Sequence, residues 1–184
     1  MKELSLNILD IVENSVKADA SLTEIILNEE NGTLVITVKD NGRGMSEDTL
    51  KSVTNPFYTT RTTRRVGLGI PLFKLACEQT GGELSITSRE RTDELPGGTE
   101  VTAIFNTQHI DFPPLGDVIS TLVTLLQGHP DRDFYYSHKK GEASVELDTR
   151  ELRAVLEDVP LSTPEVLLWV RENLEEQYQN AFNK

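Results

Sequence analysis

The sequence predicts an α/β (α+β) two-layer sandwich, with helices on one face of a mixed β-sheet and a small C-terminal α/β extension. Two observations predict this fold. Up to Phe105, segments with helical and strand-like patterns follow in the order helix, hairpin, helix, loop, helix, hairpin. Pro113-Pro114 then marks a boundary, beyond which further short segments follow. We therefore expect one domain over residues 1–106 and an extension over residues 107–184.

A helix and a hairpin open the chain. Apolar residues at helical spacing predict an amphipathic helix from Leu4 to about Ala18. Ser21–Asn28 and Thr33–Lys39 read as strands, and the Glu-Glu-Asn-Gly sequence between them is a hairpin turn signal.

The next segments complete the first domain. A short helix is expected over Ser46–Val53, because its first residue is a suitable N-cap and two acids follow it. Asn55–Arg65 is polar and contains a proline, which predicts a loop. Leu68–Gln79 is a predicted helix that Gly81-Gly82 ends, and Glu83–Ser88 and Thr99–Phe105 are predicted strands.

The extension is expected to contain a helix over Leu115–Gln127, two short strands around the turn His138–Gly141, and two further helices, the last from Thr163 to about Tyr178. Its apolar helix faces have two interpretations. They are buried inside a small self-contained unit, or they form a surface for a partner or a homodimer. His109, His129 and His138 all fall in predicted loops, so we expect surface histidines.

Composition and charge argue against several classes of function. The net charge is -12 and there is no long basic run, which argues against non-specific binding to nucleic acid or to an anionic membrane surface. No apolar stretch approaches the ~20 residues that cross a bilayer, and the acidic opening is unlike a signal peptide. The single Cys77 lies in an apolar run and is expected to be a buried thiol. We expect a cytoplasmic protein.

Three polar residues share one face of the first helix. Asp10, Asn14 and Lys17 are spaced at i, i+4 and i+7. A carboxylate, an amide and an ammonium group in a row could orient water, bind a metal ion and contact a phosphate. The alternative is that they belong to the solvated stripe of an amphipathic helix, together with Glu3 and Asn7.

The second predicted strand ends in a carboxylate. Asp40 continues the phase of Leu34, Ile36 and Val38, so its side chain is expected on the inner face. A carboxylate there needs a hydrogen-bond donor, and a ligand amino group is one candidate. The alternative is an ordinary turn, since Asp-Asn-Gly is a common turn sequence.

The loop Asn55–Arg65 has the opposite charge to the rest of the chain. It carries three arginines, four threonines and no acid, and it leads into a helix that opens with Gly67 and Gly69. Free N–H groups at a helix start, with guanidinium and hydroxyl donors beside them, suit a polyphosphate.

Thr99 begins the last strand of the first domain and shares its phase with Val101, Ala103 and Phe105. Its hydroxyl therefore points inward, beside Asp40 if the two strands are neighbours. The alternative is that it is only a strand residue, because threonine is common in strands.

These segments, in this order, resemble the GHKL superfamily: DNA gyrase, the heat-shock chaperone ATPase, histidine kinases and mismatch-repair ATPases. The resemblance covers just over half of the chain and implies a Bergerat-type ATP-binding fold. The matching boxes are the N-box Asp10–Lys17, the first glycine box Asp40–Met45, the kinase F-box Asn55–Arg61, the second glycine box Gly67–Ile70 and the third, Gly97–Thr99.

The resemblance implies an adenine pocket. Asp40 would accept a hydrogen bond from the adenine amino group, and Thr99 would support it through a water molecule. Gly42 and Gly44 would shape the pocket, and Met45 of the same box belongs to the cofactor-binding set.

It also implies a phosphate and metal site. Asn14 would coordinate Mg²⁺, Lys17 would contact phosphate and Asp10 would be the general base. One asparagine plus phosphate oxygens suits Mg²⁺, which keeps several waters. The lid and phosphate contacts would come from Thr59, Thr60, Arg61, Arg65, Gly67, Leu68 and Gly69.

The chain departs from the family pattern at three points. Gyrase-like members have Glu where this chain has Asp10, which is shorter by one methylene. Arg65 occupies a position where many members have an additional glycine. The lid is also very short.

The F-box and the compact lid favour the kinase branch. The resemblance therefore implies a regulatory protein that binds ATP and Mg²⁺ and transfers the γ-phosphate to a separate protein partner, an organisation similar to that of anti-sigma-factor serine kinases. The alternative is a switch, in which ATP binding or slow hydrolysis controls partner binding without phosphotransfer. A DNA-processing ATPase is disfavoured by the acidic charge.

Overall fold

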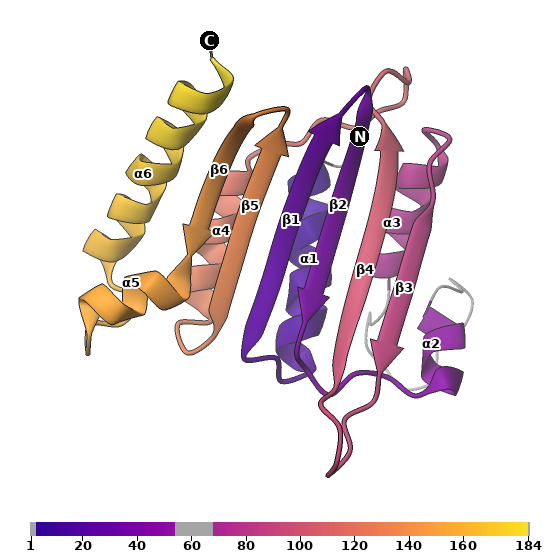
Figure 1. Cartoon of the computed structure of the whole chain (residues 1–184), viewed down its shortest axis with the longest axis horizontal. Helices are drawn as coiled ribbons and strands as arrows, with labels where there is room; N and C mark the ends of the chain where they lie inside the picture. Colours follow the sequence, from indigo (N-terminus) through magenta and orange to yellow (C-terminus); the bar gives the residue numbers. More distant parts are fainter. Residues whose placement is uncertain (1–2, 54–67, 184) are drawn as a thin grey trace.

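A computed structural model describes residues 3–53 and 68–183. Within these residues the chain forms one six-stranded mixed sheet in the order β3-β4-β2-β1-β5-β6 (Figure 1). The strands are β1 (Leu22–Glu30), β2 (Thr33–Asp40), β3 (Leu84–Arg89), β4 (Gly98–Asn106), β5 (Asp133–Lys140) and β6 (Ala143–Asp148). The helices are α1 (Leu4–Lys17), α2 (Glu47–Val53), α3 (Gly69–Glu78), α4 (Val118–Gly128), α5 (Thr149–Leu156) and α6 (Pro164–Phe182).

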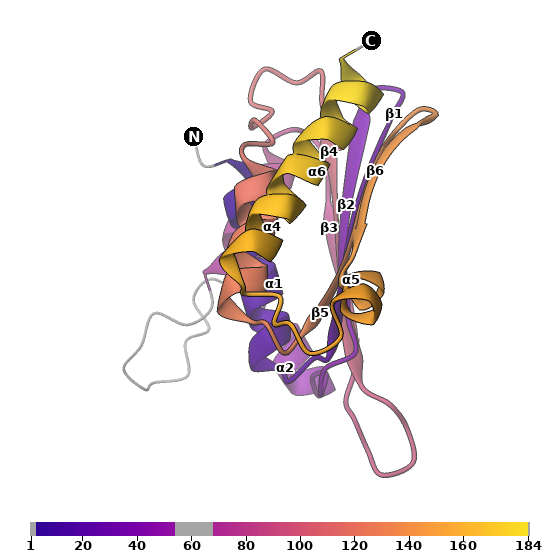
Figure 2. The ribbon, with the colours of Figure 1, turned by 90° about the vertical axis from the view of Figure 1, so that its left-hand side faces the viewer.

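The predicted two-layer fold is confirmed. Helices α1, α3, α4 and α6 pack on the same face of the sheet (Figure 2). Alternate strand residues point to this face, as the period of two requires, and they form the core with the apolar sides of the helices. Cys77 lies in this core and is fully buried.

The C-terminal part adds to the same sheet. β5 pairs in parallel with β1, and β6 pairs antiparallel with β5, while the other neighbouring strands are antiparallel. The apolar side of α4 is buried in the common core through Leu122, Leu125 and Leu126. The expectation that this part is self-contained is therefore wrong, whereas the expected α/β extension is confirmed.

The prediction of a surface loop at His138 is also wrong. Strand β5 continues to Lys140, so His138 lies within the strand and not in a loop. Its side chain is buried, with 2% exposure. Its Nε2 lies 3.0 Å from Glu29 Oε1, and its Nδ1 lies 2.9 Å from the hydroxyl of Tyr178 in α6. The Tyr178 hydroxyl lies 2.6 Å from that of Tyr136. Partners from β1 and α6 thus satisfy the buried imidazole.

A neutral imidazole fits this network. Nε2–H donates to Glu29, Nδ1 accepts from Tyr178, and Tyr178 accepts from Tyr136, so that each group has a partner. Burial lowers the pKa of His138, and the hydrogen bond to Glu29 only partly opposes this effect. Burial raises the pKa of Tyr178 to about 12, so both tyrosine hydroxyls keep their protons at neutral pH.

Within residues 3–53 and 68–183, no helix combines the length and apolar character that a membrane crossing needs.

Candidate functional site

The Asp40 carboxylate stands at the end of β2 on the helix-covered face, in phase with Val38. Its Oδ2 accepts a 2.7 Å hydrogen bond from the hydroxyl of Ser15 in α1. Its Oδ1 accepts a 2.9 Å hydrogen bond from the backbone N–H of Gly42. Two donors therefore fix the carboxylate, and each oxygen keeps a lone pair for a further donor.

The segment after β2 lies tightly against α1 and β3. A side chain at Gly42 would place its Cβ 2.8 Å from the Ala18 carbonyl oxygen. Gly44 has a φ of +68°, and its Cβ would lie 1.8 Å from the carbonyl oxygen of Arg89. Both positions require glycine, because a Cβ would collide with backbone that the segment must pass.

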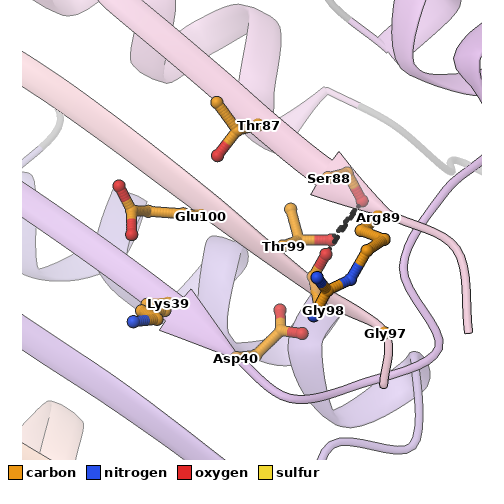
Figure 3. Close-up of a pocket in the computed structure, with 9 residues that line it drawn as sticks. All are labelled: Lys39, Asp40, Thr87, Ser88, Arg89, Gly97, Gly98, Thr99 and Glu100. Atoms are coloured by element: carbon orange, nitrogen blue, oxygen red, sulfur yellow. Dashed lines mark hydrogen bonds between the residues drawn. The ribbon is translucent and has the colours of Figure 1, made fainter. Parts of the chain in front are cut away.

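Thr99 is the register partner of Asp40 across β2 and β4. Its hydroxyl lies 2.8 Å from that of Ser88, the neighbouring residue in β3 (Figure 3). Ser88 Oγ also accepts a 2.8 Å hydrogen bond from the Met45 backbone N–H. Ser88 thus connects the segment after β2 to the start of β4, on the same face as Asp40.

An open hollow occupies the other face of this corner. Strand alternation puts the side chains of Lys39, Thr87 and Glu100 on the face opposite Val38 and Val101, away from the helices that cover the core. Asp40, Ser88 and Thr99, which lie on the inner face, also border this hollow. It is lined by Lys39, Asp40, Thr87, Ser88, Arg89, Gly97, Gly98, Thr99 and Glu100 (Figure 3).

The polar face of α1 lies next to the start of α3. Asp10 is half-buried, and Asn14 and Lys17 are exposed. A Cβ on Gly69, the first residue of α3, would lie 3.2 Å from the Asp10 Cβ. The start of α3, which is the positive end of its helix dipole, therefore lies beside Asp10. Asn14 and Lys17 remain accessible to a ligand. By contrast Asn7, which the alternative interpretation put on the solvated stripe, is 2% exposed.

The polar face of α1 offers one donor of a kind suited to a magnesium ion. Among the described residues, no three His, Cys, Asp or Glu side chains form a cluster that could bind a metal ion. The exposed Asn14 amide oxygen is a hard donor of the kind that Mg²⁺ accepts, and Mg²⁺ sites in proteins commonly have few protein ligands.

Several predicted site residues lie outside the described residues: Thr59, Thr60, Arg61, Arg65 and Gly67. Leu68 is described and is 55% exposed at the N-cap of α3.

Two serines at the site were not assigned a role from the sequence. Ser15 holds Asp40, and Ser88 holds Thr99 and Met45. The strand phase of Leu84 and Ile86 already puts Ser88 on the inner face, so this residue could have been found. Ser15 gives no such signal, because its partner is 25 residues away.

Comparison with known proteins identifies related sequences. The family model of histidine kinase-, DNA gyrase B- and HSP90-like ATPases matches residues 2–109. A putative sensor protein of Shewanella frigidimarina is 31% identical over 108 residues, which is 56% of this chain and 16% of that protein. The sensor histidine kinase YvrG of Bacillus subtilis is 31% identical over 105 residues, 54% of this chain and 17% of that protein. The chain thus spans about a sixth of the length of these relatives.

Among solved structures, the Aquifex aeolicus MutL ATPase domain complexed with ADP matches with a TM-score of 0.52 and 17% identity. The match covers 97% of this chain and 70% of that one, and it shows a shared fold.

Proposed function

The chain belongs to the histidine kinase-, DNA gyrase B- and HSP90-like ATPase family. From this premise we propose that it is a regulatory protein that binds ATP with Mg²⁺ and transfers the γ-phosphate to a separate protein. Relatives such as YvrG are named sensor histidine kinases, which supports the kinase assignment. The observation that carries the proposal is the Asp40 carboxylate, fixed on the inner face by Ser15 and Gly42.

Asp40 recognises the adenine base. A carboxylate with both oxygens already oriented presents an acceptor to the adenine amino group at little entropic cost. A charged acceptor also gives a stronger hydrogen bond than a neutral one. Thr99, held by Ser88, adds a hydroxyl on the neighbouring strand, where a water can join it to the base.

The polar face of α1 holds the phosphates. Lys17 contacts a phosphate directly, and Asn14 offers its amide oxygen to Mg²⁺, which neutralises phosphate charge when it is bound. The N–H groups at the start of α3, beside Asp10, add the positive end of a helix dipole. Phosphoryl transfer depends mainly on such positioning and charge stabilisation.

Asp10 serves as the general base. It accepts the proton of the attacking group, which is a side chain of the partner protein in the kinase reaction and water in hydrolysis. The residue that receives the phosphate is on the partner, a serine, threonine or histidine.

Labelled γ-phosphate tests the proposal. The protein is incubated with [γ-³²P]ATP, Mg²⁺ and proteins that co-purify with it, and both labelled protein and free phosphate are measured. We expect label on a partner, and none with Asp10→Ala, which still binds nucleotide. Label released only as phosphate would instead indicate the hydrolytic switch. An Asp10→Ala protein with normal turnover would refute the base assignment.

A further inference from the structure

We propose that Arg132, which lies beyond the matched residues 2–109, is a positioning residue for the nucleotide site. It acts on the turn Ala18–Ala20 that follows α1, and through this turn on Asp40 and the segment after β2. The inference rests on the proposed function, because it assumes that a nucleotide occupies this site.

The turn is connected to the nucleotide site on one side. The Ala18 carbonyl accepts a 2.8 Å hydrogen bond from the Arg43 N–H, and the Lys17 carbonyl accepts one of 2.7 Å from Arg43 Nη2. The Ala20 N–H donates to the carbonyl of Ser15, whose hydroxyl holds Asp40. Any shift of the turn therefore moves groups that define the adenine pocket.

Arg132 holds the same turn from the other side. Its Nη1 donates to the carbonyl of the buried Ala20 at 3.1 Å, and its Nη2 forms a 2.8 Å ion pair with Asp19. The guanidinium thus stands at the C-terminal end of α1, where a cation also interacts favourably with the helix dipole.

The backbone of the turn needs this support. Asp19 has a φ of +59°, in the left-handed region where helix ends usually have glycine. The N–H of Ala20 bonds to Ser15 in the manner of a Schellman motif, which requires that conformation. An aspartate there carries a steric cost that glycine lacks, and the partly exposed ion pair to Arg132 offsets part of this cost.

Neighbouring residues attach Arg132 to the extension and to α1. The Arg132 N–H closes a turn with the His129 carbonyl at 3.1 Å, and His129 Nε2 lies 2.8 Å from Glu13 of α1. Arg153 of α5 donates 2.7 Å hydrogen bonds to the carbonyls of Pro130 and Arg132. The turn 129–132 therefore connects the C-terminal extension to α1.

The first test compares Arg132→Ala with Arg150→Ala by calorimetric titration with ADP and Mg²⁺. Arg150 pairs with Asp148 in the same extension, so its loss changes net charge equally without touching the turn. We expect Arg132→Ala to raise the Kd for ADP about five-fold or more, the lower end of coupling between sites, and Arg150→Ala to leave it unchanged. Arg132→Lys, which keeps the positive charge but lacks the two separate nitrogens that contact Ala20 and Asp19, should fall between.

The outcomes separate the two proposals. Failure of the wild type to bind ADP refutes the proposed function. Normal binding by wild type and by a folded Arg132→Ala protein refutes the positioning role alone.

A second pair of variants keeps the inference testable if Arg132→Ala does not fold. Asp19 and Asp111 have side-chain exposures of 64% and 63%, and Asp111 follows the end of β4 remote from Thr99. Asp19→Lys repels Arg132 and should weaken ADP binding, whereas Asp111→Lys makes the same charge change and should not. Equal Kd values for these two variants would overturn the inference.

Discussion

The hydroxyl of Ser15 donates a 2.7 Å hydrogen bond to the Asp40 carboxylate, and this bond joins α1 to the end of β2. Ser15 is 2% exposed, so no water can easily replace the hydroxyl. We expect Ser15→Ala to lower the free energy of unfolding by about 1 kcal/mol and to raise the Kd for ADP about five-fold. Urea unfolding and calorimetric titration measure the two effects. The exposed Ser144→Ala is the control, and an unchanged Kd for Ser15→Ala would remove the serine from the site.

Asn14 should carry the magnesium dependence of binding. Asn14→Ala removes the amide oxygen proposed as the protein ligand, so ATP should bind this variant equally with Mg²⁺ or with EDTA. Asn180→Ala, at an exposed position of α6, should keep the wild-type difference. If Mg²⁺ still tightens ATP binding to Asn14→Ala, the ion has another ligand.

Gly44 and Gly141 form a matched pair for backbone strain. Both have positive φ, +68° and +59°, but a Cβ at Gly44 meets the Arg89 carbonyl, whereas a Cβ at Gly141 meets no atom within 4 Å. Gly141→Ala should lower the free energy of unfolding by about 1–2 kcal/mol. Gly44→Ala should lower it by about 3 kcal/mol or more, because the backbone must also shift. Similar urea midpoints for the two variants would show that the close approach to Arg89 is unimportant.

His138 should make stability depend on pH. Burial holds its pKa below the ordinary value of 6.5, so the unfolded chain binds more protons in the interval between the two values. The contribution of the neutral His138 to stability is therefore fully present above pH 6.5, and it is lost as the pH falls through that interval. Glu29 acts at lower pH: hydrogen bonds from Lys140 and His138 outweigh burial and hold its pKa below 4.5, so its contribution is lost below pH 4.5.

Urea midpoints between pH 7.5 and 5 measure the contribution of His138. The wild-type midpoint should fall with acidification, and His138→Gln, which cannot titrate, should show a smaller fall. The same slope for His138→Gln and wild type would assign the pH dependence to other groups.

Local patterns predicted the elements and the direction of Asp40. Alternation along β2 put its carboxylate on the inner face, and the two-residue period did the same for Thr99. These inferences needed only short-range periodicity, and the structure confirms both orientations.

Non-local pairing accounts for what the sequence could not predict. Nothing in Asp133–Lys140 indicates that it joins β1 in parallel, since the choice of neighbour depends on the packing of the whole sheet. His138 appeared to be a loop residue because Lys139, Lys140 and Gly141 follow it. Its partly buried partners, Glu29 and Tyr178, lie 109 and 40 residues away.

The affinity of wild type and Asp40→Asn for ADP, measured by calorimetric titration in Mg²⁺, tests the central claim most directly. Asparagine has one acceptor oxygen instead of two, so it cannot satisfy Ser15, Gly42 and the adenine amino group together. We predict measurable binding by wild type and a Kd at least ten-fold higher for Asp40→Asn, since a hydrogen bond to a charged group contributes about 1.5–3 kcal/mol. Equal Kd values, or no binding by wild type at millimolar ADP, would contradict the account.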